Sequence, residues 1–294
     1  MLVNVDKIKV NNRIKRSRGE LAFFIIAFIF LALVVSTYVV SFFFGIMWGL
    51  KTHEEIILNP IALPKKPQFR NYIDAFTLLN VNGVNMIGMI ANSLWLVIGG
   101  SVITIAGVGL MAYACTKYEF VGRRLLIGIN IMTVIIPLMG ALPSQIRAYN
   151  NLGMMNSPMI LIAYIGGFGT YNLYMTAFFK NLSWEYAEAA FIDGAGHFKV
   201  LVKIMIPLAM GPTMALMVMK AVEIWNNYEF PLVFMRRMPT LATGIFLFGL
   251  QTQRMVRKDI HVAATMLSSI PILVLYISFN KTILTNVSFG GLKG

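Results

Sequence analysis

Ionisable residues are scarce in this sequence. Only 13% of its 294 residues are charged, whereas 57% are hydrophobic. Soluble domains carry about a quarter charged residues, so this composition excludes an ordinary soluble protein and indicates one that lives in a bilayer. The 25 Lys and Arg residues outnumber the 12 acidic ones, and the formal net charge is +13. Because these basic residues fall mainly in loops beside apolar stretches, we expect contact with membrane lipid and no nucleic-acid binding.

Groups that carry catalysis are also missing. The single cysteine, Cys115, cannot form an internal disulfide and has no Cys or His cluster near it, so no metal site is expected. The sequence contains no G-x-x-x-x-G-K-[ST] phosphate loop, so the chain cannot hydrolyse ATP alone. We therefore expect no catalytic residue, no metal and no cofactor on this chain. A membrane enzyme is a disfavoured alternative, because no acid, base or metal set converges.

Six stretches have about the length that a bilayer-crossing helix needs, roughly 20 apolar residues. They predict an all-α integral membrane protein with six transmembrane helices, at 21–45, 90–114, 125–142, 158–179, 206–224 and 263–284. The first is longer than the roughly 7 to 15 apolar residues of a cleaved signal, so we expect it to be retained. The second is rich in glycine and other small residues, which predicts close helix packing.

The remaining segments complete the predicted organisation. A basic tail, 1–20, precedes the six-span domain, 21–284, and a short tail, 285–294, follows it. The polar segment 47–87 is long enough for a small external cap. The apolar run 241–250 is too short to span and suits a re-entrant or interfacial helix at the outer mouth.

Ionisable residues are nearly absent from the predicted spans. Proton-driven transporters usually keep Asp, Glu or His inside the membrane, so this chain is expected to take its driving energy from elsewhere. The exceptions are Lys220 and Glu223, three residues apart in the fifth span, which predict a local ion pair near its outer end. A self-assembled passive channel remains an alternative.

The most specific pattern lies in the loop between predicted spans four and five, 183–207. From Glu188 it reads EAAFIDGAGHFKVLVKIMIPL. Ser183 is a plausible N-cap for a short helix rich in Glu and Ala. Asp193 and Gly194 are expected to end that helix, since Gly takes backbone angles that other residues avoid. The loop therefore predicts a helix, a tight turn and a second helix on a stiff membrane stem.

This loop resembles that of the permease subunits of ABC importers, which reads EAA, three residues, Gly, nine residues and I-x-L-P. The matching positions are Glu188, Ala189, Ala190, Gly194, Ile204 and Pro207, with Ile206 in place of the Leu. The resemblance implies a coupling helix that sits in a cleft of a separate ATPase subunit. It gives Glu188 a polar contact to the ATPase, the two alanines close packing, and Asp193 with Gly194 the turn.

Further stretches resemble the carbohydrate-type permeases, in particular the second, G-type membrane subunit of the maltose importer. They are NSL, AYA with a basic turn, DGA, WNNYEFPL and GGLKG, at 92–94, 112–124, 193–195, 225–232 and 290–294. The resemblance covers 92–294, with Ser183 in place of a common Pro and a tail shortened around Phe289. It implies that the tail reaches toward the ATPase dimer through Gly290, Gly291, Leu292, Lys293 and Gly294.

The resemblance implies one membrane subunit of an ATP-driven, binding-protein-dependent importer. Its partners would be a second permease, two ATPase subunits that carry ATP and Mg, and an extracytoplasmic solute-binding protein. The expected location is the bacterial cell membrane, with both termini in the cytoplasm, an orientation that the distribution of basic loop residues weakly favours. A sugar is the expected substrate, and amino acids, peptides or phosphorylated polyols are alternatives.

Two further sets of residues are candidates for contact with substrate or partner. Aromatic and amide groups that suit a neutral polyol are Tyr171, Asn172, Tyr174, Trp225, Asn226 and Asn227, although burial between helices explains them equally well. A basic cluster in the predicted outer loop between spans five and six comprises Arg236, Arg237, Arg254, Arg257 and Lys258. We expect this cluster to dock an acidic face of the binding protein, with selection of an acidic sugar as the alternative.

Overall fold

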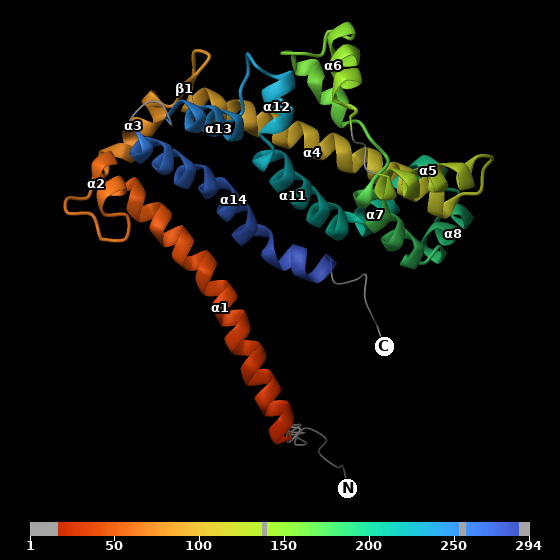
Figure 1. Ribbon diagram of the computed structural model, residues 1–294. Coiled ribbons are helices and arrows are strands. Elements are labelled where there is room, and N and C mark those ends of the chain that lie inside the picture. The colour runs from red at the N-terminus through yellow and green to blue at the C-terminus, as the bar shows by residue number, and fades with distance from the viewer. Residues whose placement is uncertain (1–16, 137–139, 253–256, 288–294) are drawn as a thin grey trace.

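Helices make up most of the described chain in the computed structural model, which describes residues 17–136, 140–252 and 257–287 (Figure 1). Three helices are long and apolar enough to cross a membrane: α1 (Arg18–Gly49), α4 (Met86–Lys117) and the part of α14 (Lys258–Val287) that ends at Lys281. A fourth candidate is the segment 197–208 together with α11 (Met210–Asn226), which meet at a bend of 69°. The described residues therefore hold three or four candidate spans.

The predicted spans at 125–142 and 158–179 are not continuous helices. α5 (Arg123–Ile135) stops because Ile136 precedes Pro137 and takes the extended backbone that a residue before proline prefers. The second segment is divided between the 3-10 helix η2 (Pro158–Tyr164) and α7 (Thr170–Asn181). Gly169, at φ 107°, separates these two helices. The short helix α6 (Leu142–Asn151) lies between the two broken segments.

The helix α4 is the centre of the packed core, with α7, α11 and η2 against it. Its small residues let these neighbours approach closely, as the sequence predicted. A Cβ on Gly107 would collide with the backbone carbonyl of Gly166, and one on Gly100 would lie 2.9 Å from Ile224 Cδ1. The helix α14 packs against α11 on one side and α1 on another.

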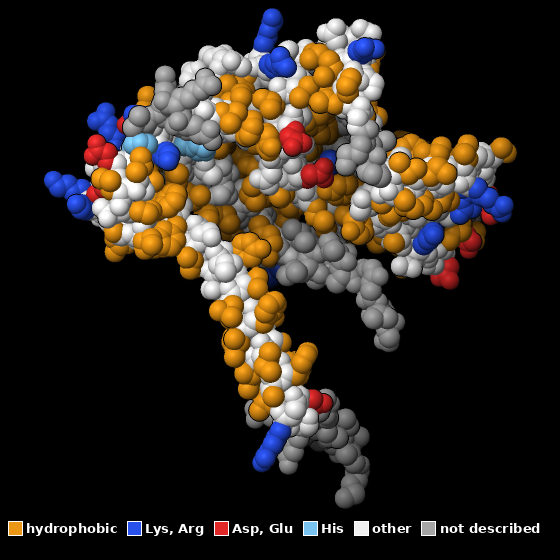
Figure 2. Space-filling view, viewed as in Figure 1, with side chains coloured by type: hydrophobic (Ala, Val, Ile, Leu, Met, Phe, Trp, Pro, Cys, Tyr) orange, Lys and Arg blue, Asp and Glu red, His pale blue; other side chains and the backbone are white. Residues whose placement is uncertain are grey.

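The helix α1 diverges from this core (Figure 1). It begins with a capping box, in which the Ser17 hydroxyl accepts from Glu20 N and the Glu20 carboxylate accepts from Ser17 N. Near its other end Gly45 abuts the Met266 side chain of α14, and Met47 is buried. Between these ends its large hydrophobic side chains are exposed, as Figure 2 shows along most of its length. The first predicted span is thus one helix with an uncovered apolar surface.

The predicted cap at 47–87 is a folded unit at one end of the long helices (Figure 1). It contains α2 (His53–Leu58), α3 (Arg70–Leu78) and an antiparallel hairpin of β1 (Asn80–Val81) and β2 (Val84–Asn85). The helices α12 (Glu229–Phe234) and α13 (Leu241–Thr252) lie at the same end. α13 is the short apolar helix that the sequence predicted at 241–250, and it packs against α4 and α14.

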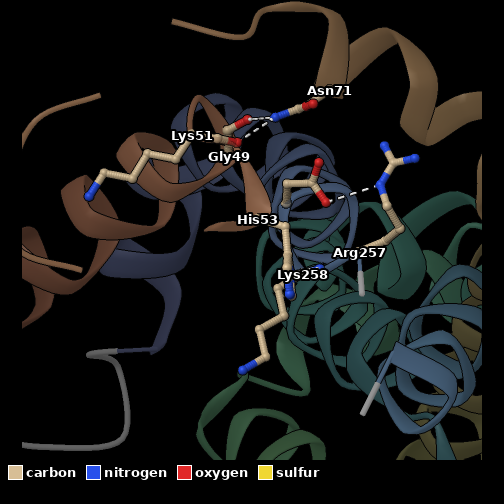
Figure 3. A network of polar contacts seen from close by, with 7 residues as sticks. Gly49, Lys51, His53, Asn71, Arg257 and Lys258 are labelled. Carbon is tan, nitrogen blue, oxygen red and sulfur yellow. Dashed lines mark hydrogen bonds and ion pairs between the residues drawn. The ribbon is translucent and has the colours of Figure 1, made fainter. Parts of the chain in front are cut away.

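Polar contacts join this cap to the start of α14 (Figure 3). Asn71 Nδ2 donates to the Gly49 carbonyl at 3.0 Å and to the Lys51 carbonyl at 2.8 Å, which fixes α3 against the end of α1. The backbone N–H of Lys258 donates to His53 Nδ1 at 3.2 Å, which joins α14 to α2. Each of these contacts pairs a backbone group with a side chain of the cap.

Candidate functional site

The loop predicted to couple to an ATPase folds as a helix, a turn and a helix. α8 (Glu185–Ile192) ends in a turn closed by two backbone bonds, from Gly194 N to Phe191 O at 3.0 Å and from Ala195 N to Ala190 O at 2.9 Å. Gly194 has φ 77°, the left-handed conformation in which glycine is favoured. The short helix α9 (His197–Val200) follows. We call residues 185–208 the elbow.

The start of α8 differs from the prediction by one residue. Trp184, not Ser183, occupies the N-cap position. The Ser183 hydroxyl still accepts a hydrogen bond from Glu185 N at 3.2 Å, so it satisfies one free N–H at the helix start. Two carboxylates, of Glu185 and Glu188, lie in the first turn, where they interact favourably with the helix dipole.

The second arm of the elbow is irregular before it enters the core. A π-helical turn, η3 (Leu201–Met205), leads into the short helix α10 (Ile206–Leu208) and a break at Ala209. Pro207 lacks the N–H that would continue the ladder, which accounts for the irregular hydrogen bonding. Ile204 is half-buried and Pro207 is exposed. The predicted span 206–224 is therefore a straight helix only from Met210 onward.

The surface of the elbow combines acidic and apolar side chains. Ile192 is 86% exposed and Phe198 is 78% exposed. Glu188, Ala189 and Asp193 are exposed beside them, whereas Ala190 is half-buried and Ala187 is fully buried. Large apolar side chains that protrude from a short turn are typical of a surface that another protein covers.

An aromatic cluster ties the elbow to the end of α4. The Tyr118 hydroxyl lies 3.1 Å from the Tyr113 hydroxyl and 3.1 Å from His197 Nδ1. The Tyr118 ring makes edge contacts with Trp184 and His197, at 5.8 and 5.5 Å between ring centroids. Lys117 Nζ donates to the Leu182 carbonyl and lies over the Trp184 ring. We did not predict this cluster, because its members are up to 84 residues apart.

Two of the candidate sugar-facing residues are buried packing groups. Asn172 accepts a hydrogen bond from Asn130 Nδ2 at 3.0 Å, and Asn130 Oδ1 accepts from Gly169 N at 2.6 Å. These bonds hold the glycine-rich break before α7 against α5. Trp225 is also buried, and its Nε1 donates to the Ser268 carbonyl of α14 at 3.2 Å. We did not single out Asn130 from the sequence, although an amide side chain within the predicted apolar span 125–142 could have indicated it.

A polar triad joins α7 to α11. Tyr171 Oη donates to Glu223 Oε2 at 2.9 Å, and Lys220 Nζ pairs with Glu223 Oε1 at 2.7 Å. The Lys220 ammonium also lies 5.4 Å from the centroid of the Tyr171 ring. The predicted Lys220–Glu223 pair is confirmed, and Tyr171 is added to it. The other candidate side chains, all exposed, are those of Tyr174, Asn226 and Asn227.

The remaining predicted residues lie at the chain end or beside the cap. Arg254 and the tail from Gly290 to Gly294 lie outside the described residues. Arg236 and Arg237 are exposed after α12, and the Arg236 carbonyl accepts from Asn82 of the hairpin. Arg257 and Lys258 are exposed at the start of α14, where Arg257 pairs with Asp259 at 3.2 Å. The described members of the predicted basic cluster, Arg236, Arg237, Arg257 and Lys258, therefore lie at the cap end, away from the elbow.

Sequence and structure comparisons identify the family. A family model described as "Binding-protein-dependent transport system inner membrane component" matches residues 104–287, which include the elbow, α7 and α11. The chain belongs to this family. It is thus an ABC importer permease, a membrane transport subunit, and the ATPase is a separate subunit, as predicted.

Individual relatives agree with this assignment. The chain is 24% identical, over 86% of its length and 83% of the relative, to the diacetylchitobiose uptake system permease protein NgcG of Streptomyces coelicolor. It is 27% identical, over 85% of its length and 89% of the relative, to the arabinooligosaccharides transport system permease protein AraQ of Halalkalibacterium halodurans. A crystal structure of a bacterial ABC transporter involved in import of the acidic polysaccharide alginate aligns with TM-score 0.73 and 21% identity, covering 90% of this chain and 98% of that one.

Proposed function

We propose that this chain is one of two permease subunits of an ATP-driven importer for a sugar or oligosaccharide. The relatives NgcG and AraQ are named for saccharide uptake, which supports a saccharide as the cargo. The other subunits would be a second permease, two ATPases that hold ATP and Mg, and an extracytoplasmic binding protein. This chain would carry out no chemical step. It would supply half of the translocation path and one of the two elbows that contact the ATPases.

The helices can make six crossings of the membrane if the two at 125–142 and 158–179 are broken helices. The crossings would be α1, α4, α5, the pair η2 and α7, α11, and α14. Irregular backbone within a membrane is tolerated where protein buries it or where it lines an aqueous cavity. The buried Asn130 and Asn172 supply such cover at the break before α7. The elbow and both termini would lie in the cytoplasm, and the cap would face outward.

The observation that carries the proposal is the exposed elbow. Its turn is fixed by Gly194, its outer face bears Ile192 and Phe198, and its base is bonded to Tyr118 of α4. A rigid projection of this kind seats in a groove on a partner and passes displacement into the helices behind it. ATP-driven closure of the ATPase dimer would press the two elbows together and turn the cavity outward, and hydrolysis would reverse the change.

Co-purification tests this proposal. The tagged chain, extracted in mild detergent from its native membrane, is expected to bring down a second permease and an ATPase. In liposomes with the co-expressed binding protein, the complex should accumulate a labelled oligosaccharide only with ATP. Purification of the chain alone, or uptake without ATP, would refute the assignment.

A charge reversal then locates the ATPase contact. Glu188→Lys should lower the recovered ATPase about tenfold, as expected for loss of a contact to a charged group, and leave the second permease in place. Glu54→Lys is the matched control, because Glu54 is an exposed helical glutamate at the cap end. Equal ATPase recovery in wild type, Glu188→Lys and Glu54→Lys would place the ATPase contact elsewhere.

A further inference from the structure

The face of α11 that bears Glu223 is left open by the other described residues. The buried side chains of this helix, including Ala221, Ile224 and Trp225, face α4 and α14. Along the opposite face Met219, Glu223 and Asn226 are exposed, one helical turn apart. The Glu223 side chain is 51% exposed, whereas its partner Lys220 is only 15% exposed.

The expected depth of this face argues against a lipid contact. Glu223 lies ~20 Å along the helix from Met210, the first residue of α11, at 1.5 Å rise per residue. The hydrocarbon core of a bilayer is about 30 Å thick, so a crossing α11 that begins at the inner boundary would place Glu223 in the outer third of that core. A half-exposed carboxylate is costly against lipid tails, and such groups face a bundle interior or a water-filled cavity.

The view of the surface agrees with an aqueous setting. Figure 2 shows acidic groups near the centre of the drawn face, over the region where Figure 1 draws α11 and α12. The only acidic residues on these two helices are Glu223 and Glu229, and both are exposed. The open side of α11 therefore carries negative charge.

We infer that Tyr171, Lys220 and Glu223 form a binding site for the hydroxyl groups of a neutral saccharide on the translocation path. This inference rests on the proposed function and deepens it. Each Glu223 oxygen accepts one hydrogen bond from within the triad. A carboxylate offers about four acceptor positions, so about two remain for substrate hydroxyls. Lys220 lies inward, and its ion pair with the carboxylate fixes the orientation of that group.

The aromatic rings beside the carboxylate complete the site. Tyr171 and Tyr174 lie three residues apart on α7, and the Tyr174 side chain is exposed. Their rings offer flat apolar surfaces in addition to the Glu223 carboxylate. A mostly apolar surface with a few well-placed polar groups suits the binding of a sugar. The same exposed carboxylate repels a uronate or sulfonate group. This face therefore favours a neutral saccharide over an acidic one such as alginate.

The test uses the complete importer in liposomes with its binding protein. Diacetylchitobiose, arabinooligosaccharide and an alginate oligosaccharide serve as labelled probes. Glu223→Gln should lower the maximal uptake of the neutral probe about tenfold, because a hydrogen bond to a charged group is replaced by a neutral one. Tyr171→Phe should lower it about threefold, since the ring stays and one orienting bond is lost. The amounts of second permease and of ATPase that co-purify with both variants should match those of the wild type.

Matched measurements separate the outcomes. Tyr38→Phe makes the same change on the exposed surface of α1 and should leave uptake unchanged. Normal uptake by Glu223→Gln, loss of the second permease from that variant, or wild-type transport of the alginate probe alone would each overturn the site and leave the importer assignment standing. Absence of ATP-dependent uptake of every probe by the wild type would overturn the importer assignment itself.

Discussion

A graded series at Gly194 tests whether the turn of the elbow must keep its shape. Gly194 has φ 77°, and a Cβ built on it meets no atom within 4 Å. Any penalty for a side chain there is backbone strain rather than collision. For alanine in the left-handed region that strain is about 1–2 kcal/mol. It corresponds to roughly a five- to thirtyfold shift in the population of the closed turn.

The nature of each substitute predicts the order of the effects. Gly194→Asn should be mild, because asparagine visits the left-handed region several times more often than most residues. Gly194→Ala should lie in the middle. Gly194→Pro should abolish uptake, because proline fixes φ near −65° and removes the N–H that bonds to the Phe191 carbonyl.

The assay is ATP-driven uptake by the reconstituted importer, with the amount of subunit in the membrane measured in parallel. Gly196→Ala is the control, because Gly196 has φ −78° and no neighbour within 4 Å of its built Cβ. This variant should behave as wild type. Equal uptake by Gly194→Ala, Gly194→Pro and Gly196→Ala would refute the claim that the turn transmits force.

Two further changes probe the polar groups that hold the fold. Asn130→Leu leaves Gly169 N without its acceptor and should destabilise the purified complex by about 1–3 kcal/mol in thermal unfolding. Thr133→Val is the control and should not destabilise it. Equal unfolding midpoints for the two variants would show that the bond is dispensable. Lys51→Met removes a buried ammonium that donates to the carbonyls of Asn59 and Pro60. Trypsin added from outside should then cut after Lys65 about tenfold faster, because the loop is held less firmly. An unchanged cleavage rate would show that Lys51 does not hold this loop.

Local signals predicted the elbow well. The Glu- and Ala-rich run and the Gly194 turn each depend on the conformational preferences of a few residues. The Lys220–Glu223 pair was predictable for the same reason, because a helix brings residues three apart together. The irregular backbone around Pro207 was not predicted. The position of the N-cap was missed by one residue, which is the usual uncertainty at helix ends.

Contacts between distant segments could not be predicted in this way. The sequence left Asn172 and Trp225 open between sugar contact and burial, because their partners lie on α5 and α14, about 42 residues away along the chain in each case. The broken spans had visible signals, Pro137 in one and three glycines in the other. Hydropathy averaged over about 20 residues conceals such breaks, because the polar cost of a broken helix is met by side chains elsewhere.

The elbow and the polar triad lie at opposite ends of the helix pair α7 and α11. α7 ends at Asn181, just before the elbow, and α11 begins at Met210, just after it, while the Tyr171–Glu223 bond joins the same two helices further along. A tilt of about 10° at the Ala209 break would move Glu223 by ~3–4 Å over its ~20 Å lever arm. That displacement is greater than a hydrogen bond tolerates, so α7 must follow α11 or release it. Movement of the elbow would therefore displace Glu223, where the saccharide is proposed to bind.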